Sequence, residues 1–344
     1  MDPFVKNIPK ITVLMPVYNC ELYIREAVDS ILNQSYADFE LLIIDDASSD
    51  ETVSIIKKYT DDRIHLIQKK SNQGLIDSLN LGLQVAKGKY IARMDGDDIS
   101  LPDRFTKQVA FLDNNDEIVV CGSIFKILGS NELIKVPEFH NDIALVLLRN
   151  NCIAHPSVML RAETIHKNKI VYDGSKIAAE DYAMWGKLVN YGKLHNLQEC
   201  LLEYRIHDKQ VSNEFQELQK KMGQRIRIEI NLSNLSYFFN EEERDLITKI
   251  CINSMNYSFT EVKLVLKLQK ALLFANQNGV YEPVGFQKYL DSFDDAVVNH
   301  YFKIARKNPL KFIEYLIIKK QLRNNLRIKQ ELKYFIKSIF FWNK

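Results

Sequence analysis

The stretch Tyr90-Ile-Ala-Arg-Met-Asp-Gly-Asp-Asp98 is a short apolar run that ends in three carboxylates. Its first residues are typical of a buried strand, whereas Asp95, Asp97 and Asp98 crowd around a glycine. Carboxylates this close repel one another unless a cation lies among their oxygen atoms. Ligands of open α/β sheets bind outside the carboxyl ends of the strands. The stretch therefore predicts an α/β fold that holds a divalent metal and a phosphorylated ligand.

Short β-rich runs alternate with helical periods around this stretch. Strands are predicted at residues 11–17, 39–44, 64–67, 90–94 and 118–128. Helices are predicted at residues 21–34, 50–59, 75–86 and 102–112, with Gly88 as the C-cap of the third. This alternation predicts a Rossmann-like, mostly parallel sheet with helices on both faces.

The rhythm changes after residue 138. We predict helices at 142–149 and 180–191 and strands at 155–160 and 198–206. From residue 215 strand signals vanish and the pattern indicates amphipathic helices. We therefore predict three parts: a leader of residues 1–9, an α/β domain of residues 10–214 and a helical region of residues 215–344.

Composition and charge bound the protein class. The formal net charge is only +2, but residues 1–214 carry about −7 and residues 215–344 about +9. Five scattered cysteines without C-x-x-C spacing argue against disulfides and a zinc site. The sequence has no signal-peptide core and no apolar run of about 18 residues. We predict a cytoplasmic protein without a nucleic-acid partner.

Polar side chains also follow the earlier strands. Met15-Pro-Val-Tyr-Asn19 ends the first strand, and Tyr18 can cover a base or ribose, although a plain strand-to-helix turn explains the same residues. Asp45-Asp46 ends the second strand, where a carboxylate can accept a hydrogen bond from a nucleobase N–H. The alternative is helix capping, which explains the serines that follow but not this pair of aspartates. The loop Asn72-Gln-Gly-Leu75 is a weaker signal for close approach to a phosphate.

Carboxylates and histidines recur later in the chain. Glu180-Asp181 opens a helix, where the helix dipole alone favours acids, but paired carboxylates also suit a general base. His207 ends the last predicted strand, which favours a metal-ligand role over a structural one, and His155 is a less certain case. The Asp95–Asp98 cluster lacks the spaced ligands of an EF-hand and suits a metal with positions open to diphosphate oxygens.

In this order the motifs resemble the family 2 glycosyltransferases of GT-A fold, over about residues 10–213. The residues that carry the resemblance are Pro16-Val-Tyr-Asn19, Asp45-Asp46, Asn72-Gln-Gly-Leu75, Asp95-Gly-Asp-Asp98, Leu101-Pro-Asp-Arg104, Glu180-Asp181 and Tyr204-Arg-Ile-His207. The resemblance implies an inverting hexosyltransferase that uses a nucleotide-diphosphate sugar with Mn²⁺ or Mg²⁺.

The resemblance also implies roles for individual residues. The nucleotide would be held by Pro16, Val17, Tyr18, Asn19, Asp46, Asn72, Gly74 and Asp95, with Asp46 on the base and Asp95 on the ribose. Asp97 and His207 would ligate the metal, and Asp98 and Glu180 would face the donor sugar or diphosphate. Asp181 would be the general base.

The missing Q-x-x-R-W motif favours transfer of a single sugar over processive synthesis, and uridine is the default base. The expected acceptor is a glycan or lipid-linked glycan of a surface polysaccharide such as O-antigen or capsule. One alternative is a sugar-nucleotide nucleotidyltransferase, which needs a Gly-rich basic loop where residues 19–23 have none. A second alternative is a non-catalytic membrane scaffold, against which the intact Asp97, Asp181 and His207 argue.

The last residues carry about ten excess positive charges between apolar residues and end in Phe340-Phe-Trp342. Basic amphipathic helices with an aromatic end are typical of the surface of an anionic membrane. We therefore predict peripheral membrane binding through residues 309–342. A helical cap or an oligomer interface with a solvated rim is the alternative.

Overall fold

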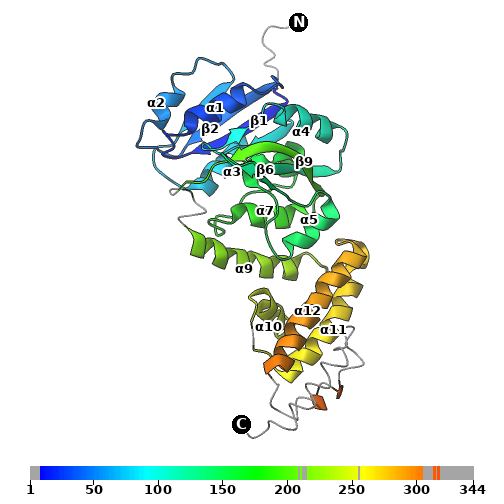
Figure 1. Cartoon of the computed structure of the whole chain (residues 1–344). Coiled ribbons are helices and arrows are strands. Elements are labelled where there is room, and N and C mark those ends of the chain that lie inside the picture. The colour runs from blue at the N-terminus through cyan, green and yellow to red at the C-terminus, as the bar shows by residue number, and fades with distance from the viewer. Residues whose placement is uncertain are drawn as a thin grey trace. The chain divides into compact units, whose positions relative to one another are not determined.

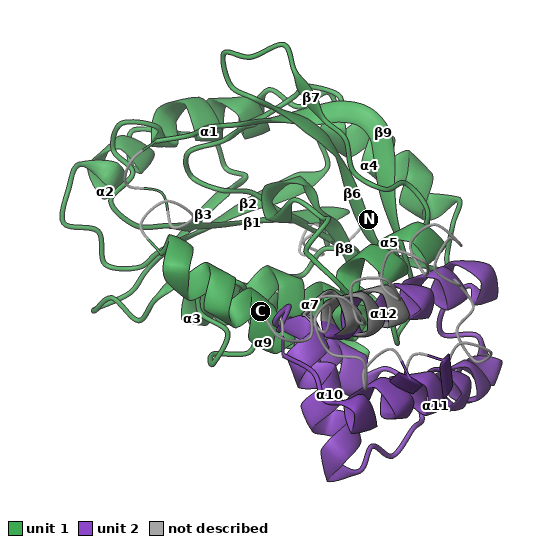
Figure 2. Cartoon of the chain, turned by 60° about the horizontal axis from the view of Figure 1, so that its bottom comes forward, with its two compact units in different colours: residues 1–226 green, residues 227–344 purple. Residues whose placement is uncertain are grey.

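The computed structural model describes residues 8–207, 210, 215–254, 256–304, 313–314 and 316–317. The chain divides into two compact units, residues 1–226 and 227–344 (Figure 2). The division falls inside helix α9 (Gln216–Ser233), later in the chain than the predicted boundary at residue 214. Most of the predicted leader and nearly all of the predicted basic segment 309–342 lie outside the described residues.

The first half of unit 1 is the parallel α/β alternation that the sequence predicts (Figure 1). Its strands lie in the order β3-β2-β1-β4, and each neighbouring pair is parallel. They are β1 (Ile11–Val17), β2 (Phe39–Asp45), β3 (Ile64–Gln68) and β4 (Tyr90–Arg93). Because they are parallel, their carboxyl ends meet at one edge of the sheet.

The second half of unit 1 extends the same sheet in a mixed manner. Strand β8 (Met159–Arg161) is antiparallel to both β4 and β6 (Ile118–Ile127), while β9 (Lys193–Tyr204) is parallel to β6. Two short strands, β5 (Ile99–Ser100) and β7 (Leu133–Ile134), are antiparallel to β9 and β6. Nine strands of the described residues thus form one mixed sheet, and the predicted α/β fold class is confirmed.

Helices cover both faces of this sheet (Figure 1). On one face lie α1 (Ile24–Leu32), α2 (Thr52–Ile56) and α4 (Arg104–Asp113), whose apolar side chains share a core with β1, β2 and β4. The other face carries α3 (Leu75–Val85), α5 (His140–Leu147) and α7 (Glu180–Leu188), and a short helix α6 (Ala162–Lys167) follows β8.

Several predicted boundaries are wrong. The predicted strand at 155–160 begins as a 3-10 turn, η1 (His155–Ser157), and the strand itself starts at Met159. Proline at the second position of this turn has a fixed φ and no N–H for a sheet ladder. Strand β9 begins at Lys193 rather than 198, while α2 ends at Ile56, before the predicted residue 59.

Gly88 is not the predicted C-cap of α3. The helix ends at Val85 with Ala86 as its cap, and Gly88 instead lies against β1. Its amide donates to Thr12 Oγ1 at 2.9 Å, and a Cβ at this position would lie 2.4 Å from the backbone nitrogen of Thr12. Close backbone approach, rather than a left-handed turn, therefore requires glycine here.

Unit 2 contains the helices α10 (Glu241–Cys251), α11 (Phe259–Ala275) and α12 (Pro283–Ile304). Capping boxes start the first two, with Asn240 and Glu243 in α10 and Ser258 and Glu261 in α11. The helices bury apolar side chains such as Leu246, Val265 and Leu290. Among the described residues we find no helix with the length and apolar character needed to cross a bilayer.

We expect Gly88→Ala to destabilise unit 1 by about 1–3 kcal/mol, because the added methyl group meets backbone that cannot move aside. Gly174→Ala is the matched control, since a Cβ there meets nothing within 4 Å. Urea denaturation followed by circular dichroism measures both. A Gly88 variant as stable as the Gly174 variant would contradict the close packing of Gly88 on β1.

Candidate active site

A cavity of about 1340 Å³ opens at the carboxyl ends of the parallel strands. Its wall contains every residue that the sequence analysis placed in a site, with the exception of Asp98. These residues are Pro16, Val17, Tyr18, Asn19, Asp46, Asn72, Gly74, Asp95, Asp97, Glu180, Asp181 and His207. The fold therefore brings together side chains that are up to 191 positions apart in the sequence, from Pro16 to His207.

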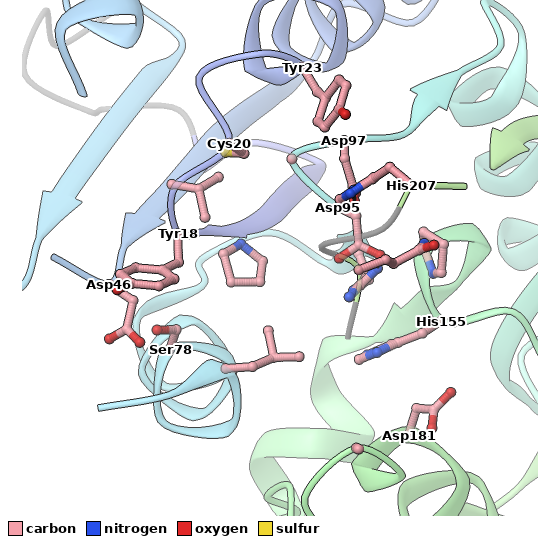
Figure 3. A pocket seen from close by; sticks show the side chains of 18 of the residues that line it. Tyr18, Cys20, Tyr23, Asp46, Ser78, Asp95, Asp97, His155, Asp181 and His207 are labelled. Carbon is pink, nitrogen blue, oxygen red and sulfur yellow. Dashed lines mark hydrogen bonds and ion pairs between the residues drawn. The ribbon is translucent and has the colours of Figure 1, made fainter. Parts of the chain in front are cut away.

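The loops after β1 and β2 are tied to each other beside Tyr18. Asn19 has a φ of 49°, and its Oδ1 accepts from the amide of Ser49 at 2.8 Å while its own amide donates to Ser48 Oγ at 3.0 Å. The amide of Cys20 donates to Thr52 Oγ1 at 2.8 Å. Tyr18 itself stays half exposed, and Figure 3 shows its ring beside Asp46 at one end of the cavity.

Asp46 organises the loop after β3. Its Oδ1 accepts from Lys69 Nζ at 2.9 Å and from the amide of Gln73 at 3.0 Å, and its Oδ2 accepts from the amide of Gly74 at 2.7 Å. Asp46 is 4% exposed, and Lys69 is a buried ion-pair partner that sequence reasoning missed. A carboxylate has about four acceptor positions, so one remains on Oδ2 for a ligand donor.

The three carboxylates after β4 form one cluster, in which a ligand atom of each lies within 4.8 Å of the others. Asp95 forms an ion pair with Arg93, and Asp97 Oδ2 lies 2.9 Å from His207 Nε2. His207 follows β9, so the mixed half of the sheet delivers it to the cluster. The Tyr23 ring packs against the His207 imidazole at a centroid distance of 4.7 Å.

Asp98 lies behind the cavity wall, which corrects its predicted place beside the donor. It is fully buried, its Oδ1 accepts from the amide of Arg205 at 2.8 Å, and its Oδ2 has no partner in the described part of the chain. Burial and the charges of Asp95 and Asp97 raise the pKa of Asp98 well above its usual value. Asp98 thus fixes Arg205, the residue that follows β9 and lies two positions before His207.

The cluster fits a divalent cation by the chemistry of its donors. Carboxylate oxygens and an imidazole nitrogen suit Mn²⁺ or Mg²⁺, and a buried, unpartnered carboxylate oxygen lies within the group. Of these residues, Asp97 and His207 both line the cavity and face each other. Asp95 lines the cavity as well, so these three side chains are the candidates to hold a metal that also reaches a ligand.

Glu180 and Asp181 start α7 in another part of the cavity wall (Figure 3 shows Asp181). Asp181 Oδ2 accepts from Asn151 Nδ2 at 2.8 Å and Oδ1 from the amide of Tyr182 at 2.6 Å, which fixes the carboxylate. Burial raises the pKa of Asp181. Burial and the charge of Asp181 raise the pKa of Glu180 to about 7.

His155 is a buried member of the same wall. Its Nε2 lies 2.8 Å from Tyr172 Oη, and its Nδ1 lies 3.9 Å from Glu180 Oε1. Burial and the charge of Arg93 lower the pKa of His155 well below its usual value, so the ring is neutral at pH 7. His155 is therefore a neutral hydrogen-bonding partner of Tyr172 and not a cation beside Glu180.

Sequence reasoning missed several residues of the cavity: Tyr23, Arg93, Asn151 and Tyr204 in its wall, and Lys69 behind Asp46. Arg93 had a signal, because it is a charged residue inside an apolar strand that precedes the carboxylate cluster. The others are ordinary surface-type residues whose positions depend on which loops meet at the sheet edge.

Comparison with known proteins agrees with this geometry. The sequence model of Glycosyl transferase family 2 matches residues 12–177. An uncharacterized glycosyltransferase of Haemophilus influenzae is 33% identical over 97% of this chain and 99% of its own length. The chain belongs to glycosyltransferase family 2. It is thus a glycosyltransferase that uses a nucleotide-sugar donor, and the predicted family, GT-A fold and enzyme class are confirmed.

Other proteins are similar to a smaller share of the chain or at lower sequence identity. The O-antigen biosynthesis glycosyltransferase WbnJ of Escherichia coli is 38% identical, over 58% of this chain and 80% of its own. The crystal structure of S. aureus TarS 1–349 in complex with UDP-GlcNAc superposes with a TM-score of 0.55 at 20% identity, over 96% of this chain and 90% of that one. Family membership also removes the nucleotidyltransferase alternative.

Proposed function

We propose that this family 2 enzyme is a metal-dependent, inverting transferase that moves one sugar from a UDP-sugar to a glycan or lipid-linked glycan of a surface polysaccharide. The observation that carries the proposal is that one cavity wall contains three groups. They are the residues proposed for the nucleotide, the Asp97–His207 pair and the fixed carboxylate of Asp181. An inverting transfer needs these three elements: a held leaving group, charge stabilisation and a base.

The nucleotide end is formed by Tyr18, Asp46 and the loop of residues 72–74. Tyr18 offers an aromatic face, and Asp46 keeps one acceptor position on Oδ2 for an N–H of the base. Gly74, with a φ of 90°, lets the backbone approach a ligand without a Cβ in the way. A TarS structure of similar fold binds UDP-GlcNAc, which supports uridine as the base.

Asp97 and His207 would hold Mn²⁺ or Mg²⁺ beside the diphosphate. When bound, the metal supplies neutralisation of the negative charge that develops on the leaving nucleoside diphosphate. Asp95, whose side chain is 26% exposed and paired with Arg93, lies next to this group and would contact the ribose. The chain's own contribution is to fix these carboxylates through Arg93, Arg205 and His207.

Asp181 would take the proton from the acceptor hydroxyl. Two hydrogen bonds, from Asn151 and from the amide of Tyr182, orient its carboxylate, and burial makes it a stronger base than a solvated aspartate. Deprotonation lets the hydroxyl oxygen attack the anomeric carbon from the face opposite the diphosphate, which inverts the configuration. Glu180, buried beside it, would contact the donor sugar.

The acceptor class rests on the named relatives. One is an O-antigen biosynthesis enzyme, and another, 39% identical over 57% of this chain, is the putative glycosyltransferase EpsE of Bacillus subtilis. Anionic-membrane binding by residues 309–342 would bring the enzyme to a lipid-linked acceptor and stays a prediction, because nearly all of that segment lies outside the described residues.

A thermal-shift panel of UDP-, GDP- and dTDP-sugars, with and without Mn²⁺, tests donor and metal together. We expect one UDP-sugar to raise the melting temperature in a Mn²⁺-dependent way, and Asp97→Asn to lose that dependence because a neutral amide is a poor metal ligand. Asp116→Asn is the control, since the Asp116 side chain is 92% exposed and is not part of the cavity wall. A shift with a GDP-sugar alone, or an equal Mn²⁺ effect in the Asp97 variant, refutes the corresponding part of the proposal.

We expect Asp181→Asn to bind the donor almost as well as wild type and to lose sugar transfer by about 10²–10⁴-fold, the usual contribution of a general base. Asparagine keeps the shape of the side chain but cannot accept a proton. Steady-state transfer to the acceptor, combined with calorimetric titration of the donor, measures the two effects separately. Turnover near that of wild type would show that another group is the base.

The pH dependence of transfer follows from the same pair. The base must be deprotonated to act, and burial raises the pKa of Asp181, so we expect kcat/KM to fall on the acid side at a higher pH than for a solvated aspartate. Glu180→Gln removes a negative neighbour and should move this inflection to lower pH. An inflection at the same pH in the wild type and the Glu180 variant would contradict coupling between the two carboxylates.

A further inference from the structure

Arg93, the last residue of β4, places a buried guanidinium in the cavity wall. It is 4% exposed and forms an ion pair with Asp95. Its Nη1 atom is the one that faces Asp95 Oδ2, whereas its Nε atom has no hydrogen-bond acceptor in the described part of the chain. Buried guanidinium donors without acceptors are rare in folded proteins. The Nε–H group therefore points to a ligand that supplies the acceptor.

The backbone of Arg93 is held firmly at this position. Its amide donates to the carbonyl of Val158 at 3.0 Å, and its own carbonyl accepts from Nη2 of the buried Arg104 at 2.8 Å. Strand pairing with β1 on one side and β8 on the other adds to this restraint. The guanidinium is thus presented from a rigid strand, as a preorganised binding group requires.

Arg93 lies between the two chemical parts of the cavity. It pairs with Asp95, next to the metal-binding residue Asp97. The positive charge of Arg93 partly offsets the rise in the pKa of Glu180 and of Asp181, and it opposes protonation of His155. All of these side chains are therefore near Arg93. Figure 3 shows Asp95, His155 and Asp181 around the same part of the cavity.

We propose that Arg93 binds the transferred sugar, with its Nε–H group donating to a hydroxyl oxygen of a neutral hexose or N-acetylhexosamine. This rests on the proposed function, because a diphosphate at Asp97 and a base at Asp181 place the sugar between them. Sugar hydroxyl groups also match the surrounding acceptors, since they can donate to carboxylates while they accept from Arg93. A uronic acid would add a further negative charge beside Asp95, Glu180 and Asp181, which disfavours it.

The test compares UDP with a UDP-sugar in the full chain with Mn²⁺ by isothermal titration calorimetry. The sugar is whichever of UDP-glucose, UDP-galactose, UDP-N-acetylglucosamine and UDP-N-acetylgalactosamine the wild type binds most tightly. Arg93→Lys keeps the charge, and with it the ionisation of the neighbouring carboxylates, but has no Nε–H group held in the plane of a guanidinium. We expect it to lose roughly 10- to 100-fold in affinity for the UDP-sugar and to bind UDP as the wild type does.

Arg161→Lys is the matched control. Arg161 is a buried arginine of the neighbouring strand β8 that is outside the cavity wall, and its side chain donates to the carbonyls of Leu112, Asn115 and Ile118. The substitution removes a guanidinium of the same kind from the same sheet. We expect a lower melting temperature but an unchanged ratio of UDP-sugar to UDP affinity, which separates sugar binding from general loss of stability.

Three results would overturn the proposal. An equal loss of UDP and UDP-sugar affinity in Arg93→Lys would place the guanidinium on the diphosphate, and no loss of either would leave it without a ligand contact. Tighter binding of UDP-glucuronic acid than of UDP-glucose by the wild type would refute a neutral sugar. Failure of the wild type to bind UDP or any UDP-sugar is a different result, because it refutes the proposed donor class itself.

Discussion

Repulsion among three carboxylates at the end of β4 is the constraint on which the active site depends. Asp95, Asp97 and Asp98 lie within 4.8 Å of one another, and each is stabilised by a different donor: the Arg93 guanidinium, the His207 imidazole and the Arg205 amide. Arg205 also donates through Nε to the carbonyl of Asp97 at 2.7 Å. The cluster is therefore stable only when the end of β9 lies against the end of β4.

This dependence explains why the sheet is mixed. The parallel strands β1 to β4 place the residues proposed for the nucleotide and the carboxylates at one edge, as in any open α/β sheet. The later strands β6 and β9 bring the segment of residues 205–207 back to that edge, while the chain between them supplies the start of α7. The binding half and the reacting half of the cavity thus come from successive halves of unit 1.

Much of the fold follows from local patterns. The buried strands β1, β2 and β4 are continuous apolar runs, so their positions and the α/β class could be predicted within a residue or so. The two-residue strands β5 and β7 could not, because their pairing with β9 and β6 is a long-range contact without a periodic signal. Gly88 was misinterpreted for a similar reason: its partner, Thr12, is distant in the chain and invisible to local reasoning.

The sequence by itself determined which reactive side chains the site contains: carboxylates at strand ends, the Glu180-Asp181 pair and His207. Local strand and helix signals were enough to locate each of them at the end of a strand or the start of a helix. Only the tertiary structure decided which of these side chains are buried, which line the cavity and which partners they contact. Burial removed Asp98 from the cavity, the Asp46–Lys69 pair turned Asp46 into the anchor of the residue 72–74 loop, and strand geometry placed the Arg93 guanidinium in the cavity wall. Solvent exposure and hydrogen-bond partners depend on which distant segments meet, and no local pattern encodes that.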